Sequence, residues 1–345
     1  MKALVLEGPN RPFDLKDVPD PAAGPGEAVA RVITCGAGLT IQHVKAGRVP
    51  ANYPLIIGHE IAAEIVEIGP GHDYGLAVGD GVTAHFYLTC GHCRWCLADR
   101  ESLCENSPGV IGRAVDGGYA EYIKLPARSF VKFPESLDYK AHPAEAGVAA
   151  DALATPVKVL RRARVRPGEW VAVFGAGGGV GIHQVMMGAY ANARVIAVDT
   201  KPEKFAACEK AGAEICIDGG RNDVVEAIVE ASGGGADVAI DYVSSRQTLE
   251  AGFKSLGVGG RLVTLGGAGQ DFEVNAMSFL AGEREVLGSR FCTKGELASA
   301  LELAGRGEVW PLVTEVRPME EANELHDLVE AGDVTGRAVI RVADG

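Results

Sequence analysis

The chain has 345 residues, and this length predicts two domains because single hydrophobic cores stop growing at about 250–300 residues. Apolar residues make up 47% and charged residues 23%, which is typical of globular proteins and argues against disorder. The net charge of −13 argues against nucleic acid and anionic membrane surfaces as partners. No apolar run reaches the roughly 18 residues that span a bilayer, and no secretory signal opens the chain. We therefore expect a cytoplasmic protein.

The chain up to about residue 150 is predicted to form a small, barrel-like β domain. Residues 27–34 and 61–68 are rich in β-branched side chains with partial alternation, which indicates strands. Glycine and proline punctuate this region, for example at Pro25-Gly26 and at Gly69-Pro70-Gly71.

From near residue 152, short apolar strands alternate with helical segments, a pattern that predicts a parallel sheet covered by helices on both faces. The six predicted strands match the doubly wound, dinucleotide-binding order. They are residues 171–174, 195–198, 215–217, 238–241, 262–265 and 286–287. Helices are predicted between most of them, at 181–190, 202–211 and 223–231. Two further helices at 296–304 and 320–329 and a last strand at 337–342 are expected to return to the first domain.

A glycine-rich turn joins the strand 171–174 to the helix 181–190. The strict G-x-G-x-x-G spacing does not fit, and the nearest patterns start at Ala176 or at Gly175 and end at Gly181. Glycines let the backbone approach a pyrophosphate, which then lies on the amino terminus of the helix. The candidate cofactor residues of the turn are Gly175, Gly178, Gly179, Val180 and Gly181.

An acidic residue, Asp199, ends the next predicted strand, 18 residues past Gly181. A carboxylate there can accept hydrogen bonds from the adenosine ribose and repels a 2′-phosphate. We therefore expect NAD, in preference to NADP, as the cofactor.

Half of the eight cysteines lie in one short stretch, with the spacing C-x₂-C-x₂-C-x₇-C. In a cytosolic chain such a cluster indicates a metal in preference to disulfides. Four thiolates suit a closed, structural zinc site, and an iron–sulfur cluster is the alternative. His92 is expected in the loop and not on the metal. The candidate ligands are Cys90, Cys93, Cys96 and Cys104.

Together with Gly58-His59-Glu60, these features resemble the zinc-containing alcohol dehydrogenases of the medium-chain dehydrogenase/reductase superfamily, over essentially the whole chain. The resemblance implies an α/β protein with a GroES-like catalytic domain at 1–152 and 290–345 and a structural-zinc lobe at 88–105. It further implies a Rossmann domain at 153–289 that binds NAD. The implied reaction is hydride transfer between nicotinamide and an alcohol or carbonyl, in the cleft between the domains.

The resemblance also assigns roles to individual residues. Thr40 and His43 match the hydroxyl and the imidazole of a proton relay. His59 and Asp151 match ligands of a catalytic zinc, and Glu60 matches the acid beside the histidine. The remaining matches are Thr155 near the nicotinamide, Lys204 near the adenosine ribose, Arg337 at the pyrophosphate and Phe86 in the substrate pocket.

One departure from the family pattern concerns the catalytic zinc. The pattern has a cysteine ligand two residues before the relay hydroxyl and an aspartate after it, whereas this chain has Gly38 and Ile41. Cys35 is displaced by three residues, which redirects its side chain. The loss argues against an ordinary catalytic zinc, although His59 and Asp151, with Glu60 as a third group, can hold a weakened one. Without a metal, the three become an acid/base site or a degenerate site held by hydrogen bonds.

Three functions stay open. The first is an NAD-dependent alcohol dehydrogenase, and the second is a zinc-independent reductase of activated carbonyls or conjugated C=C bonds. The third is a catalytically silent NAD-binding protein, against which the retained Thr40–His43 pair argues. The expected partner is a small-molecule substrate, and the resemblance implies a homodimer or homotetramer.

Overall fold

The computed structural model describes residues 1–266 and 270–343. The chain divides into two compact units. Unit 1 comprises Met1–Ala154 and Phe291–Gly345, and unit 2 comprises Thr155–Arg290. Over the described residues, no helix has the length and apolar character that crossing a membrane requires.

Unit 1 is built on a seven-stranded sheet with the order β10-β6-β5-β3-β18-β17, and β9 pairs with β3 off this path. The prediction that the chain's end returns to the first domain is confirmed, because β18 pairs antiparallel with β3. The strands are β3 (Glu27–Ala37), β5 (Ile61–Ile68), β6 (Gly81–Ala84), β9 (Tyr122–Pro126), β10 (Phe130–Lys132), β17 (Val313–Pro318) and β18 (Arg337–Arg341).

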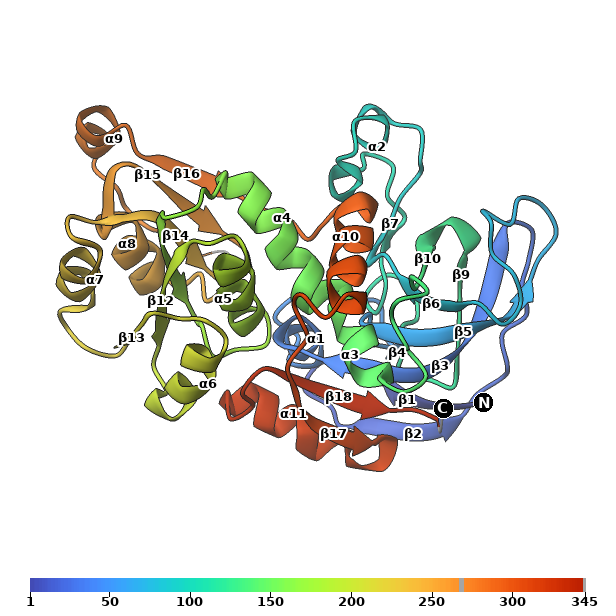
Figure 1. The fold of residues 1–345 in the computed structure, drawn as a ribbon. Helices are drawn as coiled ribbons and strands as arrows, with labels where there is room; N and C mark the ends of the chain where they lie inside the picture. Colours follow the sequence, from blue (N-terminus) through green and yellow to red (C-terminus); the bar gives the residue numbers. More distant parts are fainter. Residues whose placement is uncertain (267–269, 344–345) are drawn as a thin grey trace. The chain divides into compact units, whose positions relative to one another are not determined.

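Smaller elements complete unit 1 (Figure 1). A three-stranded sheet has the order β2-β1-β4, and a short ribbon pairs β7 with β8. These strands are β1 (Lys2–Leu6), β2 (Phe13–Asp17), β4 (Leu55–Ile56), β7 (Tyr87–Leu88) and β8 (Gly109–Val110). The helices are α1 (Leu39–Lys45), α2 (Arg94–Leu97), α3 (Pro143–Val148), α10 (Lys294–Gly305) and α11 (Ala322–Ala331). Single 3₁₀ turns lie at Glu101–Leu103, Ala127–Ser129 and Met319–Glu321.

The pairing of β18 with β3 brings two distant parts of the sequence together. Ala338 lies opposite Ala37 in the register. Arg337 therefore starts β18 beside the point where β3 ends and Gly38 leads into α1. A buried cluster of small side chains packs against β18. Its members come from α3, the following turn and β18 itself: Ala144, Val148, Ala152 and Val339.

The chain leaves α3 through a π-helical turn, Ala149–Leu153, before α4 (Ala154–Ala163) begins. A π-turn adds a residue to the helical path and is frequent at functional sites. Asp151 is the middle residue of this turn and is buried. The turn therefore rotates Asp151 relative to an uninterrupted α-helix.

Unit 2 is a six-stranded sheet with the order β13-β12-β11-β14-β15-β16, in which neighbouring strands pair in parallel. In chain order this is 3-2-1-4-5-6, so the predicted doubly wound order is confirmed. The strands are β11 (Trp170–Phe174), β12 (Arg194–Asp199), β13 (Ile215–Asp218), β14 (Ala236–Asp241), β15 (Leu256–Thr264) and β16 (Glu285–Gly288).

Helices connect these strands and pack against the sheet (Figure 1). Helix α5 contacts α6, and α7 contacts α8, as expected for two helical layers on opposite faces of a doubly wound sheet. The core between β-strands and helices is mostly aliphatic, with Phe174 and Phe253 among its larger side chains. The helices are α5 (Gly181–Tyr190), α6 (Phe205–Lys210), α7 (Val224–Ser232), α8 (Arg246–Lys254) and α9 (Ala276–Gly282), with a 3₁₀ turn at Pro202–Lys204.

Candidate active site and cofactor sites

The four clustered cysteines come together in unit 1, as their spacing predicts. The Sγ atoms of Cys93 and Cys96 lie 3.5 Å apart, and Cys90–Cys96 and Cys93–Cys104 are each 3.9 Å apart. Thiolates bound to one tetrahedral zinc at about 2.3 Å lie about 3.8 Å from one another. The four thiols therefore fit a structural zinc.

Backbone amides favour the thiolate form in this lobe. The N–H groups of Cys93 and Cys90 point at the Sγ atoms of Cys90 and Cys104, each at 3.3 Å. Hydrogen bonding, first from the backbone of His92, lowers the pKa of Cys90 to about 6. The ring of His92 is exposed, and its Nδ1 lies 2.9 Å from the carbonyl oxygen of Cys90. His92 thus lies in the loop.

The glycine turn of unit 2 runs from β11 into α5. Gly175 has a φ of +72°, which favours glycine, and a Cβ on Gly181 would lie 2.0 Å from the carbonyl oxygen of Gly175. The backbone N–H groups of Gly179 and Val180 donate to no acceptor among the described residues. Donors left free at the start of a ten-residue helix suit a bound pyrophosphate, so the turn fits a dinucleotide.

Asp199 connects the end of β12 to this turn. Its Oδ2 accepts a hydrogen bond from the N–H of Gly177 at 2.8 Å, and its Oδ1 accepts one from the N–H of Lys201 at 3.0 Å. A Cβ on Gly177 would lie 2.6 Å from Cδ of Lys204, so the buried Lys204 also lies against the turn. Sequence analysis does not single out Gly177, because only the fold shows that Asp199 and Lys204 both approach it.

A second group of potential ligands lies in unit 1. One ligand atom each from His59, Glu60 and Asp151 lies within 4.8 Å of the others, and all three residues are buried. Nε2 of His59 is 3.5 Å from Oδ2 of Asp151. The ring of His59 packs on Phe86, with ring centroids 4.0 Å apart, and Phe86 contacts Phe291 edge to face. The polar group therefore has an apolar, aromatic wall.

A buried arginine completes this group. Arg337 donates from Nε to Oε2 of Glu60 at 3.1 Å, and from Nη2 to Oε1 of Glu60 and to Oδ2 of Asp151, the last at 3.4 Å. Its side chain is 7% exposed. The resemblance predicts Arg337 at the pyrophosphate, and that role stays a prediction; the structure pairs Arg337 with two carboxylates of unit 1.

The charges in this group oppose one another. Burial raises the pKa of Glu60 to about 8; Arg337 lowers it and Asp151 raises it further. The two carboxylates raise the pKa of Arg337 more than burial lowers it, so the guanidinium stays protonated. A buried guanidinium thus lies beside two carboxylic acids and an imidazole.

The two predicted relay residues lie on α1. Thr40 and His43 are three residues apart, so they share one face of this helix, where Thr40 is exposed and His43 is half-buried. Burial and the nearby Arg48 lower the pKa of His43. His43 is therefore neutral at neutral pH, the form that accepts a proton.

Two further positions, Gly38 and Cys35, bear on the predicted metal site. Gly38 precedes α1, and a Cβ on it would lie 2.4 Å from Nη1 of Arg337. Cys35 is buried in β3, where its Sγ faces the carbonyl oxygen of Gly36 at 3.8 Å and would lie 2.7 Å from a Cβ on Gly58. Cys35 is therefore packed against backbone and stands in no metal-binding group of the described residues.

Comparisons with known proteins agree with this architecture. Residues 24–135 match the alcohol dehydrogenase GroES-like domain, and residues 179–306 match the zinc-binding dehydrogenase family. An alcohol dehydrogenase of Geobacillus stearothermophilus is 34% identical, covering 99% of this chain and 100% of the relative. An NAD-dependent alcohol dehydrogenase of Sulfurisphaera tokodaii is 30% identical, and an acryloyl-coenzyme A reductase of Metallosphaera sedula is 28% identical; each comparison covers 99% of both chains.

The solved structures agree as well. The alcohol dehydrogenase of Aeropyrum pernix has 32% sequence identity and a TM-score of 0.91, over 99% of this chain and 100% of that one. The chain therefore belongs to the zinc-type alcohol dehydrogenase family of the medium-chain dehydrogenases/reductases, and it is an oxidoreductase.

Proposed function

We propose that the protein is an NAD(H)-dependent oxidoreductase that moves a hydride between nicotinamide and an alcohol or carbonyl substrate. The observation that carries this proposal is the hydrogen bond between Gly177 and Asp199, which joins a glycine turn to an acid at the end of β12. Relatives of nearly equal length are named as NAD-dependent alcohol dehydrogenases.

The cofactor would be held by unit 2. The free N–H groups of Gly179 and Val180 would bind the pyrophosphate, and Asp199 would accept a hydrogen bond from the adenosine ribose. Lys204 lies beside Asp199 and would contact the same ribose. Bound NADH supplies the hydride, while Thr155, the second residue of α4, would lie near its nicotinamide.

The substrate would be held by unit 1. His59 and Asp151 would orient its oxygen, with Phe86 as the apolar wall. In alcohol oxidation the hydroxyl proton would pass through Thr40 to His43, which is neutral and able to accept it. In carbonyl reduction the same path would run in reverse.

We assign position 38 to the missing first ligand of a catalytic zinc. A contact supports this assignment, since a Cβ on Gly38 would meet the guanidinium of Arg337, which in turn contacts Glu60 and Asp151. The structural zinc of the cysteine lobe is independent of this loss.

A second candidate is the zinc-independent reduction of activated carbonyls or conjugated C=C bonds. It is favoured by the cation already present beside Glu60 and Asp151, and by the acryloyl-coenzyme A reductase among the relatives. A silent NAD-binding protein has less support, because Thr40 and His43 remain together on α1.

The test is turnover with two panels of substrates at several pH values. Oxidation of alcohols with NAD would support the first candidate, and oxidation of NADH by enones would support the second. Tight NADH binding without turnover of either panel would contradict both and leave the silent protein. We also propose that the protein is cytoplasmic and forms a homodimer or homotetramer. Light scattering of the purified protein would measure the mass of the assembly.

A further inference from the structure

Phe86, Tyr87 and Phe291 contact one another in unit 1 and form what we call the three-ring wall. Phe86 packs on the ring of His59, with ring centroids 4.0 Å apart. Its ring meets Tyr87 at 5.1 Å and Phe291 at 5.5 Å, each edge to face, and the centroids of Tyr87 and Phe291 are 5.7 Å apart. The position of Phe291 therefore helps to determine how Phe86 lies against His59.

The backbone of Phe291 is strained. Its φ of +50° lies in the left-handed region, which a bulky side chain seldom adopts. Such a conformation costs free energy and persists only where the surrounding structure holds it. The side chain is nevertheless buried in the wall. We therefore looked for the contact next to Phe291 that holds it there.

A fully buried imidazole lies at this point and bridges the two segments that carry the wall. Nε2 of His85 is 3.0 Å from the carbonyl oxygen of Cys292, and the rings of His85 and Phe291 have centroids 5.1 Å apart. Nδ1 of His85 is 2.9 Å from the carbonyl oxygen of Tyr87. His85 also directly precedes Phe86. One side chain thus joins segments that lie 207 residues apart in the sequence.

The protonation of His85 limits how many of these contacts are hydrogen bonds. A carbonyl oxygen only accepts, so the imidazolium donates to both carbonyl groups, whereas the neutral ring donates to one. Burial lowers the pKa of His85 more than the two carbonyl groups and Glu101 raise it, and Lys294 lowers it further. At neutral pH the ring therefore has one N–H for two acceptors.

The helix that follows the wall is fixed independently of this histidine. Helix α10 starts at Lys294, whose N–H donates to Oε1 of Glu101 and whose Nζ donates to the carbonyl oxygen of Arg128. Without the contact from His85, the start of α10 would stay in place. The strain would then be relieved at Phe291.

We propose that His85 is a positioning residue for the substrate, and that its Nε2–H donates to Cys292 and thereby holds Phe291 in the three-ring wall. This inference rests on the proposed function, in which Phe86 faces the apolar part of the substrate. A wall that is already fixed favours a substrate with a bulky apolar group, because binding then orders no further side chains. His85 therefore raises the affinity for such substrates and leaves hydride transfer itself unchanged.

Two replacements of His85 separate its two contacts. The amide N–H₂ of glutamine lies near the position of Nε2, whereas that of asparagine lies near the position of Nδ1. His85→Gln therefore keeps a donor for Cys292, and His85→Asn keeps a donor only for Tyr87. Both variants place a neutral amide in the same buried position, so they are matched controls for each other.

The first test measures NADH oxidation by cinnamaldehyde and by crotonaldehyde. Both have an aldehyde and a conjugated C=C bond, and they differ by phenyl or methyl on the β-carbon. We expect His85→Asn to raise the KM for cinnamaldehyde by about tenfold, as for loss of one buried hydrogen bond, without a change in kcat or in the KM for NADH. The KM for crotonaldehyde should change much less, and His85→Gln should behave as the wild type. Equal effects of the two variants, or a fall in kcat without a change in KM, would overturn the proposal.

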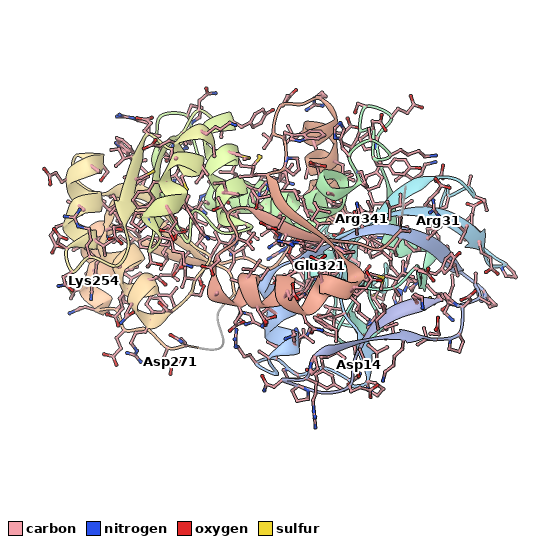
Figure 2. The ribbon with its side chains drawn as sticks, turned by 90° about the horizontal axis from the view of Figure 1, so that it is seen from below. Asp14, Arg31, Lys254, Asp271, Glu321 and Arg341 are labelled. Carbon is pink, nitrogen blue, oxygen red and sulfur yellow. The ribbon has the colours of Figure 1, made fainter. Side chains whose placement is uncertain are left out.

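The second test needs no turnover. Hydrogen exchange followed by mass spectrometry would compare peptides that cover residues 84–89 and 289–294. We expect faster exchange of both in His85→Asn and no change in His85→Gln. Arg341→Gln, at the exposed end of β18, is the surface control (Figure 2). Unchanged exchange in His85→Asn would overturn the proposal. If neither aldehyde is reduced, the proposed function fails, yet hydrogen exchange still decides whether His85 holds the wall.

The third test uses the wild type, in case His85→Asn does not fold. Nitrogen NMR of protein labelled with ¹⁵N in the histidine rings distinguishes the two neutral tautomers, and the signals of His85 are those that disappear in His85→Gln. At neutral pH we expect the proton on Nε2, which faces Cys292. A proton on Nδ1 would overturn the proposal.

Discussion

Nδ1 of His43 lies 2.9 Å from Nη1 of Arg48, five residues further along the chain. A guanidinium nitrogen only donates, so Nδ1 accepts this hydrogen bond and the neutral ring carries its proton on Nε2. Nδ1 can therefore take the relay proton only by giving up this hydrogen bond, and the imidazolium that forms would lie beside a second cation. Arg48 therefore adds to burial in keeping the imidazole neutral.

Replacing His43 tests its place in the proton path. We expect His43→Ala to lower turnover at neutral pH by about 10²-fold or more, as for loss of a general base. The loss should shrink at high pH, where hydroxide takes over the proton. His72→Ala, which changes an exposed histidine, is the control. An equal loss at every pH would contradict the relay role.

Replacing Arg48 tests the electrostatic part of the same argument. Alcohol oxidation requires neutral His43, so its rate rises as pH increases through the pKa of His43, which lies below 6.5. Removing the guanidinium in Arg48→Ala should raise the pKa of His43. The rise in the rate of alcohol oxidation with pH should then occur at a higher pH. Part of the lowering should remain, because burial, the larger cause, is unchanged. A pH–rate profile that is unchanged in Arg48→Ala would contradict an effect of Arg48 on the pKa of His43.

The cysteine lobe is expected to depend on its metal. Cys104→Ser removes one of four thiolates and should abolish binding of the structural zinc and lower the Tm, because a structural zinc contributes directly to folding. Cys216→Ser, outside the cluster, should keep the zinc. Elemental analysis and thermal unfolding provide the two readouts; iron together with visible absorption would favour an iron–sulfur cluster.

Asp199 is expected to determine the choice of cofactor. Asp199→Asn keeps an oxygen acceptor for one of the two N–H groups but removes the charge that repels a 2′-phosphate. The preference for NADH over NADPH should fall by at least about tenfold, since like charges in contact cost several kcal/mol. Asp237→Asn is the control, because Asp237 accepts from the N–H of Trp170 near the amino-terminal ends of strands β14 and β11, whereas Asp199 lies at the carboxyl end of β12. An unchanged ratio of kcat/KM values would contradict this role.

Much of the architecture could be predicted from local patterns. The six strands of unit 2 appear as short apolar runs between helical segments, and their parallel order follows from right-handed connections. The cysteine lobe is equally visible, because Cys90 to Cys104 span a short stretch that can close around one ion without help from the rest of the fold.

At position 38 the sequence predicts the loss of a zinc ligand but not the neighbour that the fold brings there. Arg337 lies at the other end of the chain and reaches Gly38 only because β18 pairs with β3. The role of Gly177 was hidden for the same reason, since its neighbours Asp199 and Lys204 come from the next strand and turn. Contacts between distant segments carry these features, and sequence spacing does not encode them.

A buried histidine of α11 is expected to make unit 1 sensitive to acid. Nδ1 of His326 lies 2.8 Å from Oε1 of Gln42, and Nε2 lies 2.9 Å from the hydroxyl of Tyr119. Since an amide oxygen only accepts, Nδ1 donates to Gln42 and Nε2 accepts from the hydroxyl of Tyr119. This pattern corresponds to the neutral form of the His326 ring. Burial lowers the pKa of His326 to about 3.

The sign of the effect follows from the proton count. The unfolded state binds a proton near pH 6.5 and the folded state does not, so stability is full above pH 6.5 and falls toward pH 3. This group alone should reduce the free energy of unfolding by up to about 1.4 kcal/mol per pH unit. His326→Gln should flatten that slope, whereas the exposed control His72→Gln should not. Denaturant unfolding at several pH values, followed by tryptophan fluorescence, would measure the free energy of unfolding. The chain has three tryptophans, of which Trp95 and Trp310 lie in unit 1. A Trp170→Phe background would therefore restrict the signal to unit 1. An equally steep slope in His326→Gln would show that other groups cause the acid sensitivity.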